Sequence, residues 1–157
     1  MMDKLKSREE LKTICLKLQS EGKSIVFTNG CFDILHKGHV LYLQQAKEQG
    51  DILVLGLNSD ASVKRLKGSS RPVNSEIDRA IVLSALSVID YVAIFEEDTP
   101  YDLIYALQPD VLVKGGDWQP EEIVGNDILA KKGGKVISLN YYDGYSTTEI
   151  IERTKVK

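Results

Sequence analysis

The sequence predicts a single α/β domain, built as a Rossmann-like, doubly wound sheet of five parallel strands. Short β-rich runs alternate with segments whose apolar residues recur at helical spacing along the whole chain. Strands separated by helices are joined by right-handed crossovers, which produce a parallel sheet covered on both faces. The 157 residues are enough for one substantial core, and no repeat, low-complexity tract or linker divides them.

Five short runs are expected to form the strands: SIVFT (24–28), DILVLGLN (51–58), YVAIF (91–95), VLVK (111–114) and KVISL (135–139). Helices are expected near 38–49, shortly after 58, and near 75–86, 100–107, 121–132 and 146–155. The spacing of Leu5, Leu11, Ile14 and Leu18 predicts a further helix in the first ~20 residues, packed outside the sheet. We therefore expect a helical extension over residues 1–23 and the main domain over residues 24–157.

Charge and composition narrow the class of protein. Twenty Lys and Arg against 23 Asp and Glu give a net charge of −3, and the basic residues are scattered, which disfavours a large nucleic-acid interface. The chain shows no signal-peptide segment and no apolar run that could span a membrane. Cys15 and Cys31 are too few for a disulfide scaffold, so we expect reduced thiols in a cytoplasmic protein.

Both histidines of the chain lie in one stretch, TNGCFDILHKGHVLYL (28–43), directly after the first predicted strand. Ligands bind at the carboxyl ends of strands in such sheets, and a helix starting near Gly38 offers unpaired amides to a phosphate. His36 in the loop and His39 in the first turn could both reach one anion. Two alternatives remain: ordinary packing residues, or a metal site with Asp33. The second lacks the glutamate and the i, i+4 spacing of the helical zinc motif.

Two more segments suit phosphate groups. In YSTTEII (145–151), Ser146, Thr147 and Thr148 supply hydroxyls beside helix-start amides, although a simple N-cap would use the same residue types. VKRLKGSSRPVN (63–74) places four cations on a polar, Gly- and Ser-rich loop: Lys64, Arg65, Lys67 and Arg71. A solvated basic face is the alternative here. Beside two phosphate sites, the loop could close over the substrates, with Lys67 as the preferred member and Lys64 and Arg79 as weaker ones.

The segment VKGGDW (113–118) follows another predicted strand. Its paired glycines could admit a nucleotide or a sugar close to the backbone. Asp117 could bind a hydroxyl, help position magnesium or merely cap a turn, and Trp118 could equally be a packing residue. Asp33 could orient a histidine or contact the substrate.

The stretch GCFDILHKGH resembles the G-x-F-D-x-x-H-x-G-H signature of the cytidylyltransferase-like nucleotidyltransferases. Within them, the chain is similar to the D-glycero-β-D-manno-heptose 1-phosphate adenylyltransferases of lipopolysaccharide-core biosynthesis. The similarity runs in order from about Ser24 to Ile151 through TNGCFDILHKGH, NSDASVKRLKG, RPVN, EEDTP, PDVLVKGGD and DGYSTTEII. The histidine motif alone would identify the superfamily, and the ordered set points to the heptose group. The wider superfamily often has an arginine at the position of Ile151; Arg153 is shifted and receives no role.

The resemblance implies transfer of AMP from ATP to a sugar 1-phosphate, with ADP-sugar and pyrophosphate as products. It implies catalytic roles for His36, His39 and Lys67, and Mg²⁺ accompanying ATP rather than a metal bound by the protein alone. The implied nucleotide-binding residues are Cys31, Phe32, His36, His39, Gly116, Asp117, Ser146, Thr147 and Thr148. The implied residues for the sugar phosphate are Asp33, Lys64, Lys67 and Arg79.

The resemblance also implies a homodimer, and no partner among nucleic acids or membranes. In bifunctional relatives the heptose kinase activity belongs to a separate, larger domain, so a stand-alone adenylyltransferase is expected. Two alternatives remain: a cytidylyltransferase acting on a polyol or amino-alcohol phosphate, and a nucleotide-binding regulatory module without turnover.

Overall fold

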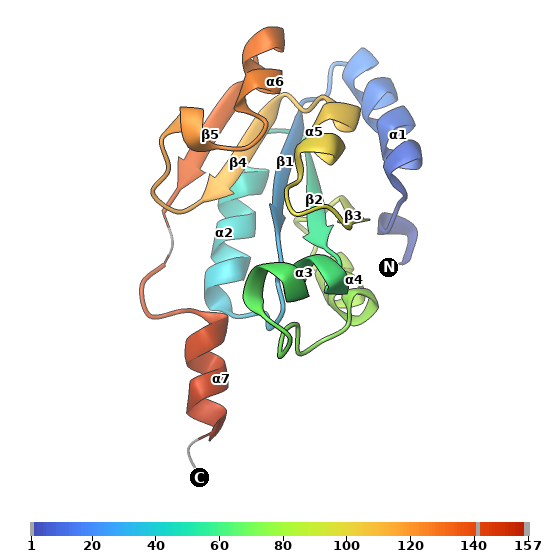
Figure 1. Cartoon of the computed structure of the whole chain (residues 1–157). Coiled ribbons are helices and arrows are strands. Elements are labelled where there is room, and N and C mark those ends of the chain that lie inside the picture. The colour runs from blue at the N-terminus through green and yellow to red at the C-terminus, as the bar shows by residue number, and fades with distance from the viewer. Residues whose placement is uncertain (1, 141, 156–157) are drawn as a thin grey trace.

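A five-stranded sheet forms the centre of the computed structural model, which describes residues 2–140 and 142–155 (Figure 1). The strands are β1 (Ile25–Gly30), β2 (Ile52–Asn58), β3 (Tyr91–Phe95), β4 (Val111–Gly115) and β5 (Lys135–Leu139). Their order is β3-β2-β1-β4-β5, and every neighbouring pair is parallel. The predicted Rossmann-like sheet is thereby confirmed. The strand order reverses between β1 and β4, so the crevice beyond the carboxyl ends of these two strands is the expected ligand site.

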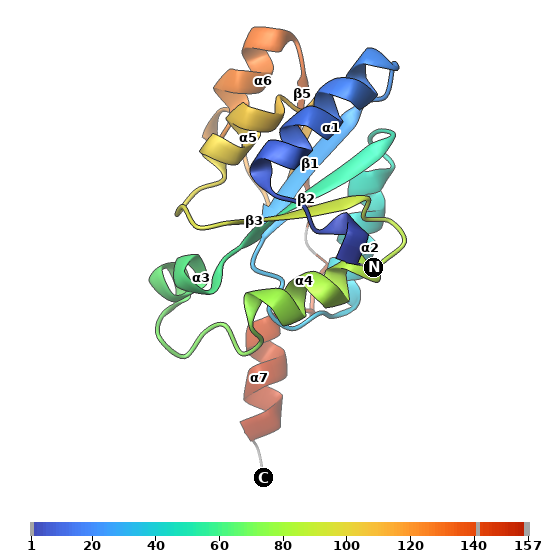
Figure 2. The same cartoon turned by 90° about the vertical axis from the view of Figure 1, so that its right-hand side faces the viewer.

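Helices cover both faces of the sheet (Figure 2). In chain order they are η1 (Met2–Lys4), α1 (Arg8–Ser20), α2 (Lys37–Lys47), α3 (Asp60–Lys67), α4 (Glu76–Ser84), α5 (Tyr101–Leu107), η2 (Pro120–Glu122), α6 (Asn126–Lys132) and α7 (Thr147–Lys155). One buried cluster joins α1, α5 and α6 to the sheet, and a second joins α2 and α4 to the opposite face. Helix α7 projects away from the sheet, and none of its described residues is buried (Figure 1).

The strands read as continuous apolar runs because both of their faces are covered. In β1, Ile25 and Phe27 belong to the cluster under α1 and α5, whereas Val26 between them belongs to the cluster under α2 and α4. Leu11 and Cys15 of α1 have no exposed surface and pack in the first of these clusters. No helix in the described ranges is long and apolar enough to cross a membrane.

The expectation of one helix over 121–132 is wrong. The chain forms the short 3-10 helix η2, turns at Gly125, and only then begins α6. Gly125 has φ +93°, in the left-handed region that favours glycine, and a Cβ there would lie 2.9 Å from Cδ1 of Ile104. Ile123 remains buried ahead of this turn, so the apolar spacing continues across a break in the helix.

Candidate active site

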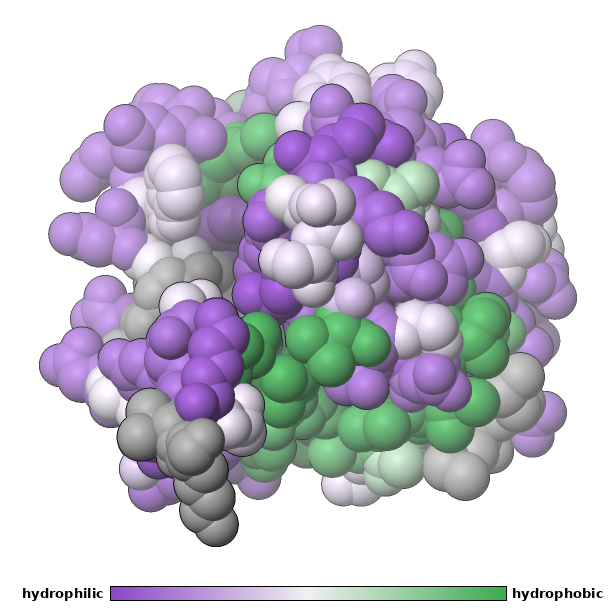
Figure 3. Space-filling view, turned by 60° about the horizontal axis from the view of Figure 1, so that its bottom comes forward, coloured by the Kyte–Doolittle hydropathy of each residue, from purple (hydrophilic) through white to green (hydrophobic). Residues whose placement is uncertain are grey.

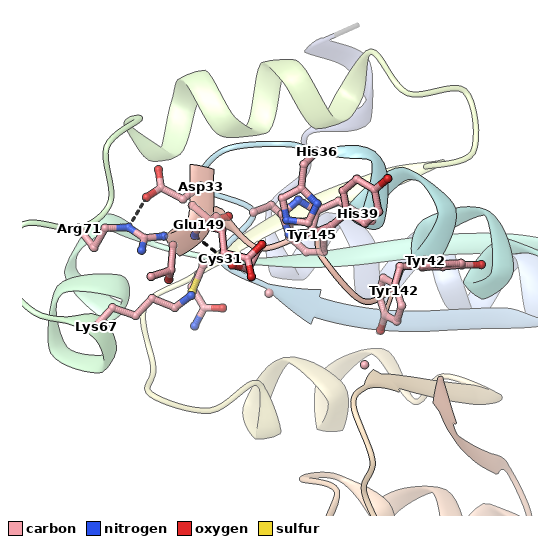
Figure 4. A pocket seen from close by; sticks show the side chains of 18 of the residues that line it. Cys31, Asp33, His36, His39, Tyr42, Lys67, Arg71, Tyr142, Tyr145 and Glu149 are labelled. Carbon is pink, nitrogen blue, oxygen red and sulfur yellow. Dashed lines mark hydrogen bonds and ion pairs between the residues drawn. The ribbon is translucent and has the colours of Figure 1, made fainter. Parts of the chain in front are cut away.

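A cavity of about 560 Å³ lies at the switch point of the sheet (Figure 4). Its walls come from the loop after β1, the start of α2, the end of α3, the end of β4, and residues 142–149, which include the start of α7. Segments that are distant in sequence therefore meet here. Among the predicted residues, those that line the cavity are Cys31, Phe32, Asp33, His36, His39, Lys67, Ser146, Thr147 and Thr148.

The two histidines stand together at the start of α2. His36 is the N-cap residue, with φ −142°, and His39 lies in the first turn. Their rings stack with centroids 3.7 Å apart and an interplanar angle of 23°, and the ring of Phe32 lies 5.1 Å from that of His39. Nδ1 of each histidine is buried without a hydrogen-bond partner among the described residues. The accessible parts of both rings line the cavity beside the first amides of α2, and this arrangement suits an anion.

Burial decides the protonation of this pair. Desolvation lowers the pKa of His39 to about 4, helped by the nearby charges of His36 and Lys67. Desolvation also lowers the pKa of His36, although the Glu149 carboxylate acts in the opposite direction. Without a bound anion, both rings are therefore neutral at pH 7. A phosphate beside the rings would favour their charged forms, so the binding of such an anion would be coupled to the uptake of protons.

Gly38 makes room for two side chains that pack at the start of α2. A Cβ at this position would lie 3.0 Å from Nδ1 of His36 and 3.1 Å from Cβ of Tyr145. The missing side chain thus lets the His36 ring and the segment before α7 pack against the start of α2. Tyr145 continues this packing, since its ring lies parallel to His36 and Nζ of Lys37 lies 5.5 Å from its centroid.

The three hydroxyls at the start of α7 have different roles. The Ser146 hydroxyl accepts a hydrogen bond from the Glu149 N–H at 3.0 Å, which is the N-cap arrangement. The Thr147 hydroxyl donates to the Ile34 carbonyl at 3.3 Å and so ties α7 to the loop after β1. Thr148 is exposed, and its hydroxyl makes no hydrogen bond within the described part of the chain. Ser146 is therefore the N-cap predicted as the alternative, and Thr148 is the member of the triplet whose hydroxyl is available to a ligand in the cavity.

Asp33 anchors residues 71–74, the end of the predicted basic loop (63–74), beside the cavity. Its side chain is fully buried and accepts hydrogen bonds from Arg71 Nε (2.6 Å) and from the N–H groups of Val73 and Asn74 (2.9 and 3.0 Å). Burial alone would raise the pKa of this carboxyl, but these donors outweigh it and lower the pKa. With its oxygens thus occupied, Asp33 positions Arg71 rather than a histidine. Nη2 of Arg71 is buried at the cavity without a partner among the described residues.

Arg79 and Lys64 lie outside the cavity lining. Arg79 is only 2% exposed, and its guanidinium donates to the backbone carbonyls of Cys31, Asn58 and Asn74 and to the Asp60 carboxylate. These bonds join the ends of β1 and β2 to the start of α4. Arg79 therefore supports the cavity from behind, while Lys67 is the lysine of α3 that reaches it.

Gly116 and Asp117 also lie outside the lining, and their place is taken by Lys114 and Gly115 at the end of β4. Lys114 is half-buried, and desolvation lowers its pKa, with the neighbouring Cys31 acting in the opposite direction. Sequence analysis placed the segment 113–118 near the ligand but did not name Lys114 as a site residue, although a lysine inside an otherwise apolar strand is a signal for one. Lining residues that were not predicted also include Tyr142, Asp143, Tyr145 and Glu149.

No group of three or more His, Cys, Asp or Glu side chains that could hold a metal ion occurs among the described residues. The arrangement considered from sequence, Asp33 with the two histidines, fails because that carboxylate is held by Arg71 and by backbone N–H groups. The cavity instead combines two histidine rings, two helix starts and three cationic side chains, those of Lys67, Arg71 and Lys114. Such a set binds and neutralises phosphate groups.

Comparison with known proteins agrees with this chemistry. Residues 27–153, which include both histidines and the start of α7, match the family described as Cytidylyltransferase-like. The chain belongs to the cytidylyltransferase-like family. It is therefore a nucleotidyltransferase, and the predicted superfamily is confirmed.

The individual similarities show how much of each protein is shared. The chain is 58% identical over 150 residues to the Bifunctional protein HldE of Syntrophotalea carbinolica, and 59% identical over 153 residues to that of Campylobacter concisus. These matches cover 96% and 97% of the chain but 31% of each relative, so the chain spans about a third of their length.

Solved structures of the family and fold are also similar. The lipopolysaccharide core biosynthesis protein from Thermoplasma volcanium is 30% identical with a TM-score of 0.64, covering 78% of this chain and all of that one. The pantoate-β-alanine ligase from Francisella tularensis, solved with an ATP analogue and β-alanine, is 14% identical with a TM-score of 0.58. It covers 96% of this chain and 76% of that one, and it shares the fold.

Proposed function

We propose that this chain transfers AMP from ATP to D-glycero-β-D-manno-heptose 1-phosphate or a closely related sugar 1-phosphate. The products are ADP-heptose and pyrophosphate, for lipopolysaccharide-core or related glycan synthesis. One observation carries the proposal. The match to Bifunctional protein HldE, at 58% identity, extends over 96% of the chain and so includes every wall of the cavity of about 560 Å³, called the phosphate cavity below. The relatives favour neither a polyol cytidylyltransferase nor a regulatory module without turnover.

The residues of the cavity suit this reaction. An oxygen of the sugar phosphate forms a bond to the α-phosphorus of ATP, and the bond from that phosphorus to the bridging oxygen breaks, so pyrophosphate leaves with the electron pair. The nucleophile is already an anion, and no strong general base is needed. His36 and His39, together with the first amides of α2, stabilise the charge on the α-phosphate. Lys67 and Arg71 lie where they neutralise the remaining phosphates.

Mg²⁺ is proposed to arrive with ATP. It prefers an octahedral shell that keeps several waters and draws on substrate phosphates and one or two carboxylates. This fits the cavity, which has no built metal cluster in the described residues but is lined by the exposed acidic residues Asp143 and Glu149. These two would hold the ion, which would neutralise the triphosphate when bound.

A homodimer in the cytoplasm completes the proposal. Figure 3 views the molecule from the end where α4 and α7 lie and shows a band of hydrophobic surface there. Exposed apolar residues in and just before α4 are Val73 (58%), Ile77 (46%), Ile81 (36%) and Val82 (50%). Exposed apolar groups that gather on one face favour a contact with a second copy. Light scattering after gel filtration, with Ile77→Lys as the disrupting variant, distinguishes dimer from monomer.

The experiment that tests the proposed reaction is a substrate matrix. ATP and CTP are each combined with heptose 1-phosphate, other sugar 1-phosphates, glycerol phosphate and phosphocholine, and pyrophosphate release and product mass are measured. We expect ADP-heptose from a single pair of substrates. Efficient formation of CDP-alcohols without ADP-sugar would replace the acceptor assignment but keep the family, and no turnover with any pair would contradict the proposed function.

A further inference from the structure

A second, smaller cavity of about 180 Å³ opens beside the first one, on the α5 side of the sheet. Its walls come from residues 98–100 after β3, from β4, and from the segment that contains Trp118 and η2. Asn29 and Lys114 line both cavities. The two cavities are therefore neighbours across the carboxyl ends of β1 and β4, with a lysine at their junction.

The walls of this smaller cavity suit a polyhydroxylated ring. Its inner surface is apolar and includes Leu112 and Ile123, whereas Asp98 and Glu122 bring carboxylates to its edge. Trp118 is 44% exposed, and its indole N–H donates to the Gly115 carbonyl at 3.0 Å, which fixes the ring at the cavity wall. Carboxylates accept hydrogen bonds from sugar hydroxyls, and an indole face covers the C–H face of a sugar. Asp98 also forms an ion pair with Arg65 at 2.7 Å, which holds this carboxylate in place.

Lys114 supplies the missing cation for a phosphorylated sugar. The side chain is half-buried at the junction of the two cavities, and no hydrogen bond or ion pair of its amine occurs among the residues that the structure describes. A half-buried ammonium without a counter-charge is costly unless a ligand provides the anion. Because Lys114 also lines the phosphate cavity, an anion held there lies between the two cavities. That is where the phosphate of an acceptor must lie to reach the α-phosphorus.

We propose that the smaller cavity binds the sugar of the acceptor, with Lys114 holding its 1-phosphate and Trp118 covering one face of its ring. This inference rests on the proposed function, and it names the part of the site that selects a sugar 1-phosphate. The larger cavity, with the histidines and the walls of Tyr142 and Tyr145, then takes ATP. In the opposite arrangement, the adenine of ATP would lie against Trp118 and the sugar would lie in the larger cavity. The experiment must therefore separate these two arrangements.

Trp118 is the only tryptophan in the chain, so its fluorescence reports on this cavity alone. The wild-type protein is titrated with heptose 1-phosphate, with and without saturating α,β-methylene-ATP, which cannot be cleaved at the reacting bond. A saturable change on adding the sugar phosphate supports the proposal. A response to the nucleotide alone, with none to the sugar phosphate in either condition, would place adenine in this cavity and overturn it.

Kinetics provide the second arm. Lys114→Met keeps the approximate length of the side chain and removes its charge. Because a charge-assisted hydrogen bond to the phosphate is lost, we expect the KM for the sugar phosphate to rise about 10- to 100-fold. The KM for ATP should be nearly unchanged. Trp118→Ala should raise the same constant about tenfold, a change of ~1.4 kcal/mol, and Trp118→Phe should restore most of it. Lys131→Met and Tyr105→Ala are matched controls on exposed sites.

The outcomes separate the inference from the reaction. If the wild type makes ADP-heptose while both substitutions leave the acceptor KM unchanged, or raise the ATP KM equally, the inference is wrong and the proposed function stands. If the wild type makes no ADP-heptose, the proposed function itself fails. Thermal unfolding of each variant, compared with that of its control, detects a loss caused by misfolding.

Discussion

The stacked histidines allow a quantitative prediction about catalysis. Removal of one preorganised donor commonly costs about 10²- to 10³-fold in turnover, so His36→Ala and His39→Ala should each lose about that much. Independent donors would multiply to a loss of about 10⁴- to 10⁶-fold in the double variant. The two rings lie 3.7 Å apart and contact each other, so removing one also releases the other. We therefore expect the turnover of the double variant to be only about tenfold lower than that of the less active single variant. This corresponds to a coupling energy of at least ~1.4 kcal/mol between the two histidines.

The assay is pyrophosphate release at saturating ATP and sugar 1-phosphate, on preparations whose thermal unfolding is measured in parallel. Gln44→Ala, on the exposed side of the same helix, is the matched control and should keep wild-type turnover. A double variant whose loss equals the full product of the single losses would show that the rings act independently. Near-normal turnover in either folded single variant would remove that histidine from the reaction.

Three further predictions concern the cavity and its support. Lys67→Ala should lower kcat/KM by about tenfold without changing thermal stability; unchanged steady-state kinetics, with exposed Lys12→Ala as control, would remove Lys67 from the site. Arg79→Met should destabilise the fold by about 3–5 kcal/mol, because a buried charge pair and three carbonyl bonds are lost. At roughly 2–4 °C per kcal/mol the midpoint should fall by about 6–20 °C, and a fall of under ~2 °C in calorimetry would refute the supporting role. The pKa of His39 lies below its unfolded value of about 6.5, so the folded protein binds fewer protons. Stability should be full above pH 6.5 and fall as the pH drops toward about 4. His39→Asn should flatten this part of the curve in denaturant titrations, and an unchanged slope would contradict it.

The strands and the histidine bend were predictable because each depends on local pattern. Covered strands are apolar throughout, and the two histidines follow directly after one of them. The break at Gly125 was missed because apolar spacing continues across it, from Ile123 to Ile128, both of them buried. Its cause is the close approach of Ile104, a residue that sequence spacing does not relate to this turn.

The site residues divide in the same way. Thr148 and the histidines were predicted from the hydroxyl and histidine motifs, and all three line the larger cavity. Lys114 stood out in the sequence only as a lysine inside an apolar strand, and its place where two cavities meet at the end of that strand needed the structure. Arg79 was grouped with the basic loop because it follows that loop in sequence. Its guanidinium turns inward between the ends of β1 and β2, a direction that burial and backbone carbonyls determine rather than charge pattern.

The exposed position of α7 affects how tightly ATP can bind. In the proposed reaction this helix would supply part of the site for the phosphates of ATP, yet none of its described residues is buried, and Thr147 provides one of its few ties to the core. Elements with so little buried surface open locally at low free energy. ATP would then bind only to molecules whose α7 is docked, and the observed affinity would fall in proportion to the fraction of docked molecules. A substitution on the outer side of α7, away from the cavity, would thus change the KM for ATP only by changing the fraction of molecules in which α7 is docked.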